Sequence, residues 1–333
     1  MRLSSLFILL AASAAAQTLQ IYAIDTEGGK ATLYVSPSGE SMLVDTGYAG
    51  NNNRDANRIA AAAAAAGVKR IDILVITHYH GDHASGLAQL AAKLPIGRIY
   101  DHGDNIDRSN AKTEAVYGPY EKARKPYPHQ SLKVGDTIPL PGVQVTVVAS
   151  DGETLANALP GAGQANPLCA TAEILPPDKG ENGRSIALMM TFGKLHIADL
   201  GDLYWDKELE LVCPTNKLGT VDLYMTTHHG TATSGSPQIV HALHPKVAIM
   251  NNGEEKGGSV KALTAITSSP GLQDLWQLHF SAEGGKEHNA DGKLIANPSA
   301  EGDEGFSISV VALADGTFKV RNNRNQFEKS YGK

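Results

Sequence analysis

The segment Thr-His-Tyr-His-Gly-Asp-His at residues 77–83 holds three imidazoles and one carboxylate within a few positions. It follows an apolar run over residues 71–76, which predicts a buried strand. Side chains two apart in an extended backbone point the same way, so alternate residues of the segment can converge on one point. Imidazole and carboxylate suit zinc, with bonds of about 2.0–2.2 Å. The segment therefore predicts a metal site where the strand ends.

The segment can serve two adjacent cations. His78 and His80 would face one cation, and Asp82 and His83 the other, because the intervening glycine lets the chain turn before a helix begins. A second interpretation makes Asp82 the N-cap of that helix, which we expect over residues 83–94. Three histidines and an acid at this spacing favour the metal site over a purely local role.

Two later segments end apolar runs with further ligand candidates. Residues 195–202 end in an acid after a glycine, Asp202, with Asp199 as its competitor. Residues 221–230 end in the paired histidines His228 and His229. Neighbours at the end of a strand face opposite ways, so we expect one histidine to bind metal and the other to point at substrate.

Strands and helices must bring these segments together. Three short strand-like runs separated by turn residues predict an antiparallel meander, at 19–23, 31–35 and 41–44. A run of alanines predicts a helix over 55–66. Further strands are expected at 143–149, 185–191, 195–198, 221–226, 246–250 and 307–321, the second and third of them as a hairpin, with helices near 236–243 and 259–268. The polar stretch 103–135 and the Gly- and Pro-rich stretch 151–184 predict lid-like insertions.

The N-terminus has the pattern of a secretory signal, with Arg2, a short apolar core and the small residues 14–16 before a cleavage site. Residues 1–16 are therefore expected to be removed, leaving no membrane span and a periplasmic or extracellular protein. Cys169 and Cys213 can form one disulfide there, although sequence alone does not show that they are close.

Charge restricts the partners. The net charge of the whole chain is −6, and the expected cleavage removes one further positive charge. A mildly acidic chain argues against binding long nucleic acids, which needs a basic face. Small-molecule or short phosphoester substrates remain open, since metal ions can supply local positive charge. The oligomeric state is not predictable.

These motifs resemble the metallo-β-lactamase superfamily. Its His-x-His-x-Asp-His signature corresponds to the segment at 77–83, its bridging aspartate to Asp202, and its late histidine to His228 or His229. The His-His-Gly motif, the Asp-Thr-Gly at 45–47 and residues 24–32 look most like the ComEC-type branch of DNA-uptake proteins. The resemblance implies an α/β fold, a four-layer αββα sandwich with mixed sheets, formed by a single domain over residues 17–333.

The resemblance also implies a ligand set. One or two zinc ions would be bound, with manganese or iron as the alternative metals. The ligands would be His78, His80, Asp82, His83, Asp202 and His228. The superfamily's third histidine on the first metal is missing, because residues 181–185 contain none. His102, His196, Asn182, Glu181 or water are the candidates to replace it, and occupancy of both sites stays open.

The expected activity is metal-dependent hydrolysis, in which a metal-bound hydroxide attacks a phosphorus or carbonyl centre. Asp82 would orient or accept a proton, and His229 would donate a hydrogen bond to the oxyanion or leaving group. The resemblance favours a phosphoester or phosphodiester substrate. A lactone, thioester or amide is the alternative substrate. The non-enzymatic alternative is a metal-dependent binding protein without turnover.

Overall fold

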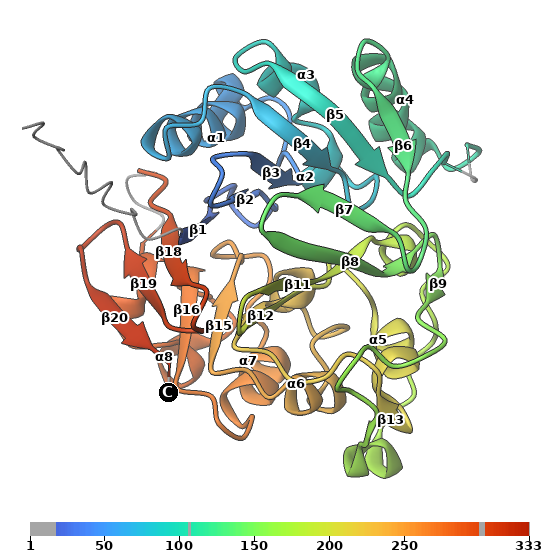
Figure 1. The fold of residues 1–333 in the computed structure, drawn as a ribbon, viewed down its shortest axis with the longest axis vertical. Coiled ribbons are helices and arrows are strands. Elements are labelled where there is room, and N and C mark those ends of the chain that lie inside the picture. The colour runs from blue at the N-terminus through green and yellow to red at the C-terminus, as the bar shows by residue number, and fades with distance from the viewer. Residues whose placement is uncertain (1–17, 106–107, 300–303, 333) are drawn as a thin grey trace, which may run out of the picture.

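The computed structural model describes residues 18–105, 108–299 and 304–332 (Figure 1). The expected signal segment, residues 1–16, lies outside them. Two nine-stranded sheets face each other, and helices cover the outer face of each.

The first sheet has the strand order β20-β19-β18-β1-β2-β3-β4-β5-β6. Its strands are β1 (Thr18–Ala23), β2 (Thr32–Val35), β3 (Ser41–Val44), β4 (Ile71–Val75), β5 (Ile96–Asp101), β6 (His129–Ser131), β18 (Ile308–Leu313), β19 (Phe318–Asn322) and β20 (Glu328–Tyr331). The predicted meander is confirmed, because β1, β2 and β3 pair in antiparallel order. β4 then joins β3 in parallel.

The second sheet has the order β17-β16-β15-β14-β12-β11-β8-β7, with β9 paired to β8. Its strands are β7 (Thr137–Leu140), β8 (Val143–Ser150), β9 (Glu153–Thr154), β11 (Ala187–Phe192), β12 (Leu195–Asp199), β14 (Leu223–Met225), β15 (Val247–Met250), β16 (Asp274–His279) and β17 (Ile295–Asn297). β11 and β12 form the expected hairpin. β10 (Gln164–Ala165) and β13 (Thr215–Asn216) form a separate short pair.

The α-helices are α1 (Arg54–Ala65), α2 (Gly81–Ala84), α3 (Leu87–Ala91), α4 (Ala111–Arg124), α5 (Trp205–Val212), α6 (Pro237–Leu243), α7 (Val260–Thr267) and α8 (Gly285–His288). Figure 1 shows α1, α3 and α4 on one side of the paired sheets and α5, α6 and α7 on the other. Buried apolar side chains form one cluster between the sheets and one under each helical layer. Burial on both faces is what makes a four-layer αββα sandwich. The predicted fold class is confirmed.

Parallel strands bring the site together. β3 pairs with β4 in one sheet, and β12, β14 and β15 run parallel in the other. The carboxyl ends of parallel neighbours lie at one edge of a sheet. Ligand candidates follow the end of β4 in the first sheet and the ends of β12 and β14 in the second, and side chains from these three segments meet between the two sheets' ends.

Some elements differ from the expectation. The single helix predicted over 83–94 is split into α2 and α3 at Gly86, where a Cβ would lie 2.1 Å from the backbone oxygen of Thr46. The strand predicted over 307–321 is two strands, β18 and β19, joined by a turn. The polar stretch 103–135 holds α4, whose Tyr117 and Tyr120 are buried against the first helical layer.

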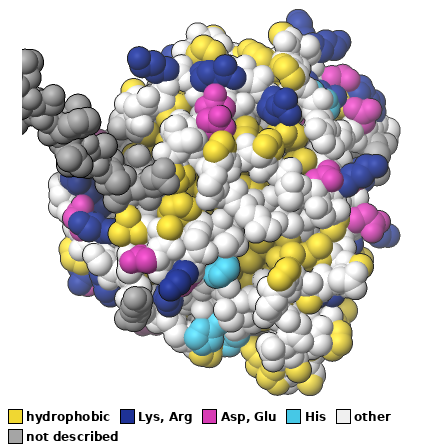
Figure 2. Space-filling view, in the orientation of Figure 1, with side chains coloured by type: hydrophobic (Ala, Val, Ile, Leu, Met, Phe, Trp, Pro, Cys, Tyr) yellow, Lys and Arg dark blue, Asp and Glu magenta, His cyan; other side chains and the backbone are white. Residues whose placement is uncertain are grey.

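Cys169 and Cys213 are joined in a disulfide, the pairing that sequence left open. Across the described ranges, none of the helices has the length and apolarity needed to cross a bilayer. Figure 2 shows basic and acidic side chains scattered among uncharged groups on one face of the molecule.

Candidate metal centre

The loop after β4 is fixed by hydrogen bonds before any ligand is considered. The carboxylate of Asp45 accepts from both the backbone N–H and the hydroxyl of Thr77, each at 2.8 Å. The backbone N–H of Thr46 donates to the carbonyl of His83 at 2.8 Å, and that of His83 donates to the carbonyl of His80 at 3.1 Å. The segment at 77–83 is thus tied to the end of β3 at both of its ends.

Four buried side chains from three segments converge beside this loop: Asp82, His83, Asp202 and His229. Nε2 of His83 lies 3.1 Å from Oδ2 of Asp202 and 3.2 Å from Oδ2 of Asp82. Nε2 of His229 lies 3.3 Å and 3.2 Å from the same two oxygens. The two ring nitrogens are themselves 3.2 Å apart.

This spacing fits a bound cation. With bonds of about 2.0–2.2 Å, the corners of a tetrahedron lie about 3.3–3.6 Å apart. The contacts among the four ligand atoms come close to that separation. Oδ1 of Asp202 is buried and has no hydrogen-bond partner within the described chain. An orphaned carboxylate oxygen beside facing imidazole nitrogens is the arrangement that a divalent cation satisfies.

The electrostatics of the cluster favour added positive charge. Burial lowers the pKa of His83, but the carboxylates of Asp202, Asp82 and Asp45 outweigh it and raise that pKa well above the usual value. Burial raises the pKa of Asp202, yet the nearby imidazoles, led by His83 and His229, hold it well below the usual range. The carboxylates therefore stay ionised and attract a cation.

A second group of imidazoles adjoins the first. Nε2 of His78 lies 3.0 Å from Nδ1 of His80 and 3.9 Å from Oδ2 of Asp202. Nε2 of His228 lies 3.6 Å from the same oxygen of Asp202. Burial lowers the pKa of His78 well below its usual value and that of His228 to about 4, so both rings are neutral near pH 7 and keep a lone pair for a metal.

The paired histidines both turn toward Asp202. The expectation that they face opposite ways is wrong, because β14 ends at Met225 and residues 227–230 form a tight turn instead of extended strand. His228 and His229 have φ of 51° and 56°, left-handed values that few non-glycine residues adopt. Such strain clusters at functional sites. Here it brings two consecutive side chains to one centre.

The outer nitrogens of four rings have partners of their own. Nδ1 of His83 lies 2.8 Å from Oδ2 of Asp45, Nδ1 of His78 lies 3.0 Å from the Thr77 hydroxyl, and Nδ1 of His228 lies 3.0 Å from the Ser234 hydroxyl. Nδ1 of His229 lies 2.9 Å from the side-chain amide nitrogen of Asn251 and 3.2 Å from the backbone carbonyl oxygen of the same residue. Hydrogen bonds of this kind fix the ring tautomer and aim the other nitrogen at a metal.

Comparison with known proteins agrees with this geometry. Residues 25–157 match the family model of the metallo-β-lactamase superfamily. The chain contains a metallo-β-lactamase superfamily domain. Its signature histidines and Asp82 lie inside the matched range, whereas Asp202 and the paired histidines lie beyond it. No curated protein matches the chain significantly.

Solved structures are similar to this chain at low identity. The metallo-β-lactamase fold protein YhfI from Bacillus subtilis is 13% identical, with 78% of this chain and 95% of that chain covered and a TM-score of 0.45. CmlA, a diiron β-hydroxylase from Streptomyces venezuelae, is 16% identical, with 77% and 48% covered and a TM-score of 0.40. MEM-A1, a subclass B3 metallo-β-lactamase from a soil metagenome, is 11% identical, with 68% and 79% covered and a TM-score of 0.39.

Other sequence candidates have different partners in the structure. Asp199 is buried against the ammonium of Lys30 and the hydroxyl of Tyr34. His196 is exposed, and its Nδ1 lies 3.2 Å from the Thr191 hydroxyl. Neither side chain belongs to the group of converging ligand atoms.

The loop that lacks the superfamily histidine is still tied to the centre. The backbone N–H of Asp202 donates to the hydroxyl of Ser185 at 3.2 Å. Glu181 is paired with His102 at 2.9 Å. Oδ1 of Asn182 is buried and has no hydrogen-bond partner in the described chain. Nδ1 of His102 is likewise buried without a hydrogen-bond partner in the described chain, so two of the predicted substitutes, Asn182 and His102, have an unused ligand atom.

Sequence reasoning missed two residues at the rim. The ammonium of Lys256 contacts Oδ2 of Asp82 and lies 3.3 Å from the hydroxyl of Tyr48. Tyr48 directly follows the Asp-Thr-Gly at 45–47, which was a usable signal. Lys256 lies in the chain beyond β15 and has no signal except the glycines that follow it.

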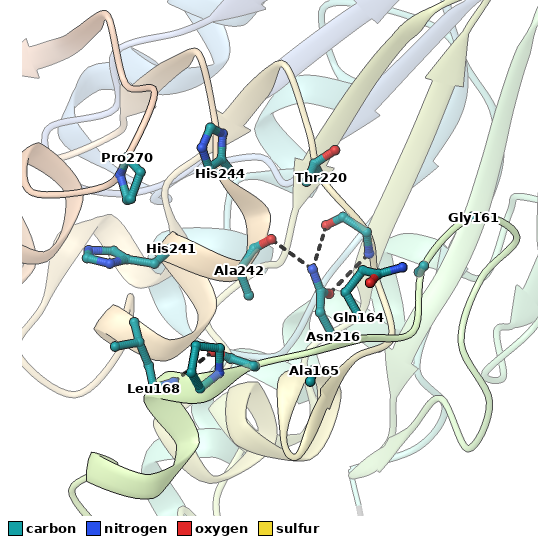
Figure 3. Close-up of a pocket in the computed structure, with 14 residues that line it drawn as sticks. Gly161, Gln164, Ala165, Leu168, Asn216, Thr220, His241, Ala242, His244 and Pro270 are labelled. Atoms are coloured by element: carbon teal, nitrogen blue, oxygen red, sulfur yellow. Dashed lines mark hydrogen bonds between the residues drawn. The ribbon is translucent and has the colours of Figure 1, made fainter.

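A separate cavity of about 440 Å³ lies between α6 and the β10–β13 pair. Figure 3 shows His241, His244 and Pro270 on one side of it and Gln164 and Gly161 on the other. None of the predicted site residues lines it. The amide of Asn216 in its wall already donates to the carbonyls of Gly219 and Ala242. The Asn216 amide in this wall therefore has its own partners, unlike Oδ1 of Asp202 in the candidate metal centre.

Proposed function

We propose that this chain is a metal-dependent hydrolase whose centre holds two cations. The observation that carries the proposal is the convergence of two imidazole nitrogens and two carboxylate oxygens from three distant segments, at separations that suit a cation of zinc size. A purely structural cluster would need its own hydrogen bonds, and Asp202 has an unsatisfied oxygen instead.

For the ligand set we use the distances to the carboxylate of Asp202 as support. We assign Asp82, His83 and His229 to one cation, His78, His80 and His228 to the other, and Asp202 to the space between them. This changes the roles first expected of the paired histidines: His229 becomes a ligand and not a group that only contacts substrate. His228, whose Nε2 faces Asp202, would take the place of the missing third histidine. The side-chain oxygen of Asn182 is a further candidate metal ligand.

Bound cations would supply positive charge against the negative charge that develops on the substrate and lower the pKa of a nearby water. The protein's own groups do the rest. Asp82 has one carboxylate oxygen in the cluster and is placed to orient a water or accept its proton. Asp45 fixes the proton of His83 on Nδ1, away from the cations.

For the substrate we propose a phosphoester or phosphodiester of small size. The support is the resemblance to the ComEC-type branch, and the net charge of −6 argues against a long polyanion. Zinc fits the donor set of imidazole and carboxylate, and manganese and iron are the alternatives to be compared with it. We also propose that the protein is exported, which the disulfide supports because such bonds persist in oxidising compartments.

The test uses metal-free protein reloaded with zinc or manganese. Metal content per chain is measured, followed by turnover of a chromogenic phosphodiester, a lactone and a β-lactam. We expect close to two zinc ions and phosphodiester turnover, both reduced in Asp202→Asn. The matched control is Asp274→Asn. It removes a carboxylate that pairs with Lys329 and does not belong to the converging ligand group.

Other outcomes separate the alternatives. Turnover of only the lactone or the β-lactam would keep the hydrolase and change its substrate. Two bound cations with no turnover of any probe would indicate a binding protein. A chain that holds no cation after reloading would end the proposal.

A further inference from the structure

Lys256 places a positive charge at the rim of the metal centre. Its ammonium contacts Oδ2 of Asp82, while its side chain remains 37% exposed. Asp82 itself is 12% exposed, so the ammonium stands between the buried ligands and solvent. A substrate that approaches the centre from solvent on this side meets Lys256.

The backbone that carries Lys256 is clamped to the histidine turn. The N–H of Gly258 donates to the carbonyl of His229 at 2.9 Å, and the N–H of Ser259 donates to that of Gly230 at 2.8 Å. Gly257 has φ +77°, and a Cβ there would lie 2.1 Å from the carbonyl oxygen of His229. Only glycine fits this close contact. The two hydrogen bonds hold the loop against the turn.

The other side of the loop is held as well. A Cβ on Gly28 would lie 3.0 Å from the Cβ of Lys256 and equally close to the backbone nitrogen of Gly253. The N–H of Gly253 closes the loop by donating to the carbonyl of Lys256 at 2.8 Å. The base of the lysine side chain is thus fixed, whereas its flexible stem lets the ammonium move by several ångströms.

Tyr48 supplies a second donor beside the ammonium. Its hydroxyl is 3.3 Å from Nζ of Lys256, and Nζ lies 5.6 Å from the centre of its ring. The backbone N–H of Tyr48 donates to Oδ2 of Asp55 at 2.7 Å, which anchors the residue to α1. An ammonium and a phenol held side by side can bind one anionic oxygen through two hydrogen bonds.

A cation at the centre changes the partner of Lys256. Oδ2 of Asp82 is one of the four converging ligand atoms, so a bound cation would engage the charge that now faces the ammonium. The ammonium would then be repelled from the cation and left without its carboxylate. The freed ammonium could then pair with an anionic group of a substrate bound at the centre.

We propose that Lys256 and Tyr48 form an anion subsite that selects substrates carrying a negative charge beside the scissile bond, as a phosphodiester does. The subsite rests on the proposed function, since it needs a cation to engage Asp82. Uncharged esters would gain nothing from it. Lys256 is therefore a specificity-determining residue and not a metal ligand.

The experiment compares zinc-loaded Lys256→Met and Tyr48→Phe with wild type, using inorganic phosphate as the probe. The matched control is Lys246→Met, because Lys246 is 39% exposed and pairs with one carboxylate, Asp222, at 2.9 Å. Phosphate affinity is measured by calorimetry, together with zinc content and the KM and kcat for a phosphodiester and a lactone.

We expect Lys256→Met to weaken phosphate binding about tenfold, or about 1.4 kcal/mol, and to raise the KM for the phosphodiester by a similar factor. The kcat should change less, and any lactone turnover should keep its KM. Tyr48→Phe should weaken phosphate binding a few-fold, and Lys246→Met should match wild type. Zinc affinity should stay equal or rise in Lys256→Met, because the competing ammonium is gone.

Two results overturn the subsite alone. One is equal phosphate affinity in zinc-loaded wild type and Lys256→Met, and the other is a loss of bound zinc in that variant, which would make the lysine structural. A wild-type chain that binds no zinc overturns the proposed function and the subsite with it. The zinc measurement on wild type thus distinguishes the two failures.

Discussion

Two clusters in this molecule contain nearly the same side chains. The metal centre has two carboxylates and two imidazoles, and the second cluster has Asp25, Glu27 and His279. In both, one ligand atom from each residue lies within 4.8 Å of the others. Composition and spacing alone do not separate them.

The hydrogen bonds of the two clusters do separate them. Asp25 accepts from the backbone N–H of Glu27 and from Nε2 of His279, each at 2.8 Å, and its other oxygen accepts from Arg58 at 3.0 Å. Every oxygen of that carboxylate has a donor, and a guanidinium supplies the positive charge. In the metal centre, one oxygen of Asp202 has no donor in the described chain. A histidine–carboxylate cluster thus indicates a metal when the protein's own donors leave it unsatisfied.

The largest expected difference concerns the aspartates. Asp202→Asn should lower hydrolysis by at least about 10³-fold, because it removes the carboxylate shared by both groups of imidazoles. It should also remove most of the stabilisation by zinc, which for wild type is about 4 kcal/mol at zinc one thousand times its Kd. Activity assays and unfolding with and without chelator provide the measurement.

The control for that prediction comes from the second cluster. Asp25→Asn should keep full zinc content and the full effect of chelator on unfolding. If Asp25→Asn loses zinc as Asp202→Asn does, the distinction between the two clusters fails.

The next effect is on stability without metal. Asp25→Asn should destabilise the metal-free protein by about 3 kcal/mol, because it removes the charge that Arg58 and His279 both face. Denaturant unfolding of chelator-treated protein measures it. A loss below about 1 kcal/mol would mean that this ion pair contributes little to stability.

A third buried carboxylate sharpens the comparison because its pKa is raised, whereas the pKa values of Asp25 and Asp202 are lowered. Glu208 on α5 accepts backbone N–H bonds from Gly235 and Ser236, and burial raises its pKa to about 7. A group whose pKa is higher in the folded state stabilises the protein fully below its unfolded pKa of about 4.5. That contribution disappears as the pH rises to about 7.

Glu208→Gln should therefore flatten the fall in unfolding free energy between pH 4.5 and 7, by about 3 kcal/mol across the window. Urea unfolding at both ends of the window measures this. Glu210→Gln, exposed on the same helix, is the control and should keep the wild-type slope. An unchanged slope in Glu208→Gln would contradict the assignment.

Local patterns predicted the parts of the site that depend on short-range geometry. The convergence near residues 77–83 follows from the two-residue period of a strand and one flexible glycine. The fold class followed from the strand pattern and the resemblance, and the layers confirm it. The disulfide was left open because no local rule reports a contact between residues 44 positions apart.

Long-range packing decided what sequence did not give. The turn at 227–230 has left-handed histidines because the 253–259 loop and β15 pack against it, and no residue pattern announces that φ. Lys256 reaches Asp82 across 174 positions. The polar composition of residues 103–135 predicts a lid, and it does not show that Tyr117 and Tyr120 of α4 are buried against the first helical layer.

The smallest effect tests what an aspartate–histidine pair does in each cluster. Asp45 holds Nδ1 of His83 at 2.8 Å and leaves Nε2 facing the metal centre, whereas Asp25 holds Nε2 of His279 at the same distance. An amide at residue 45 can turn its NH₂ toward Nδ1, which moves the ring proton to Nε2 and blocks the lone pair.

Asp45→Asn should therefore weaken zinc binding ten- to a hundred-fold, or about 1.4–2.7 kcal/mol, at one of the two sites only. A zinc titration against a competing chelator resolves the two affinities. Asp72→Asn is the matched control, because Asp72 also accepts hydrogen bonds from a neighbouring strand, through Ser41, without an imidazole. Unchanged zinc affinity in Asp45→Asn would mean that His83 does not bind metal through Nε2, and the two aspartate–histidine pairs would then be equivalent.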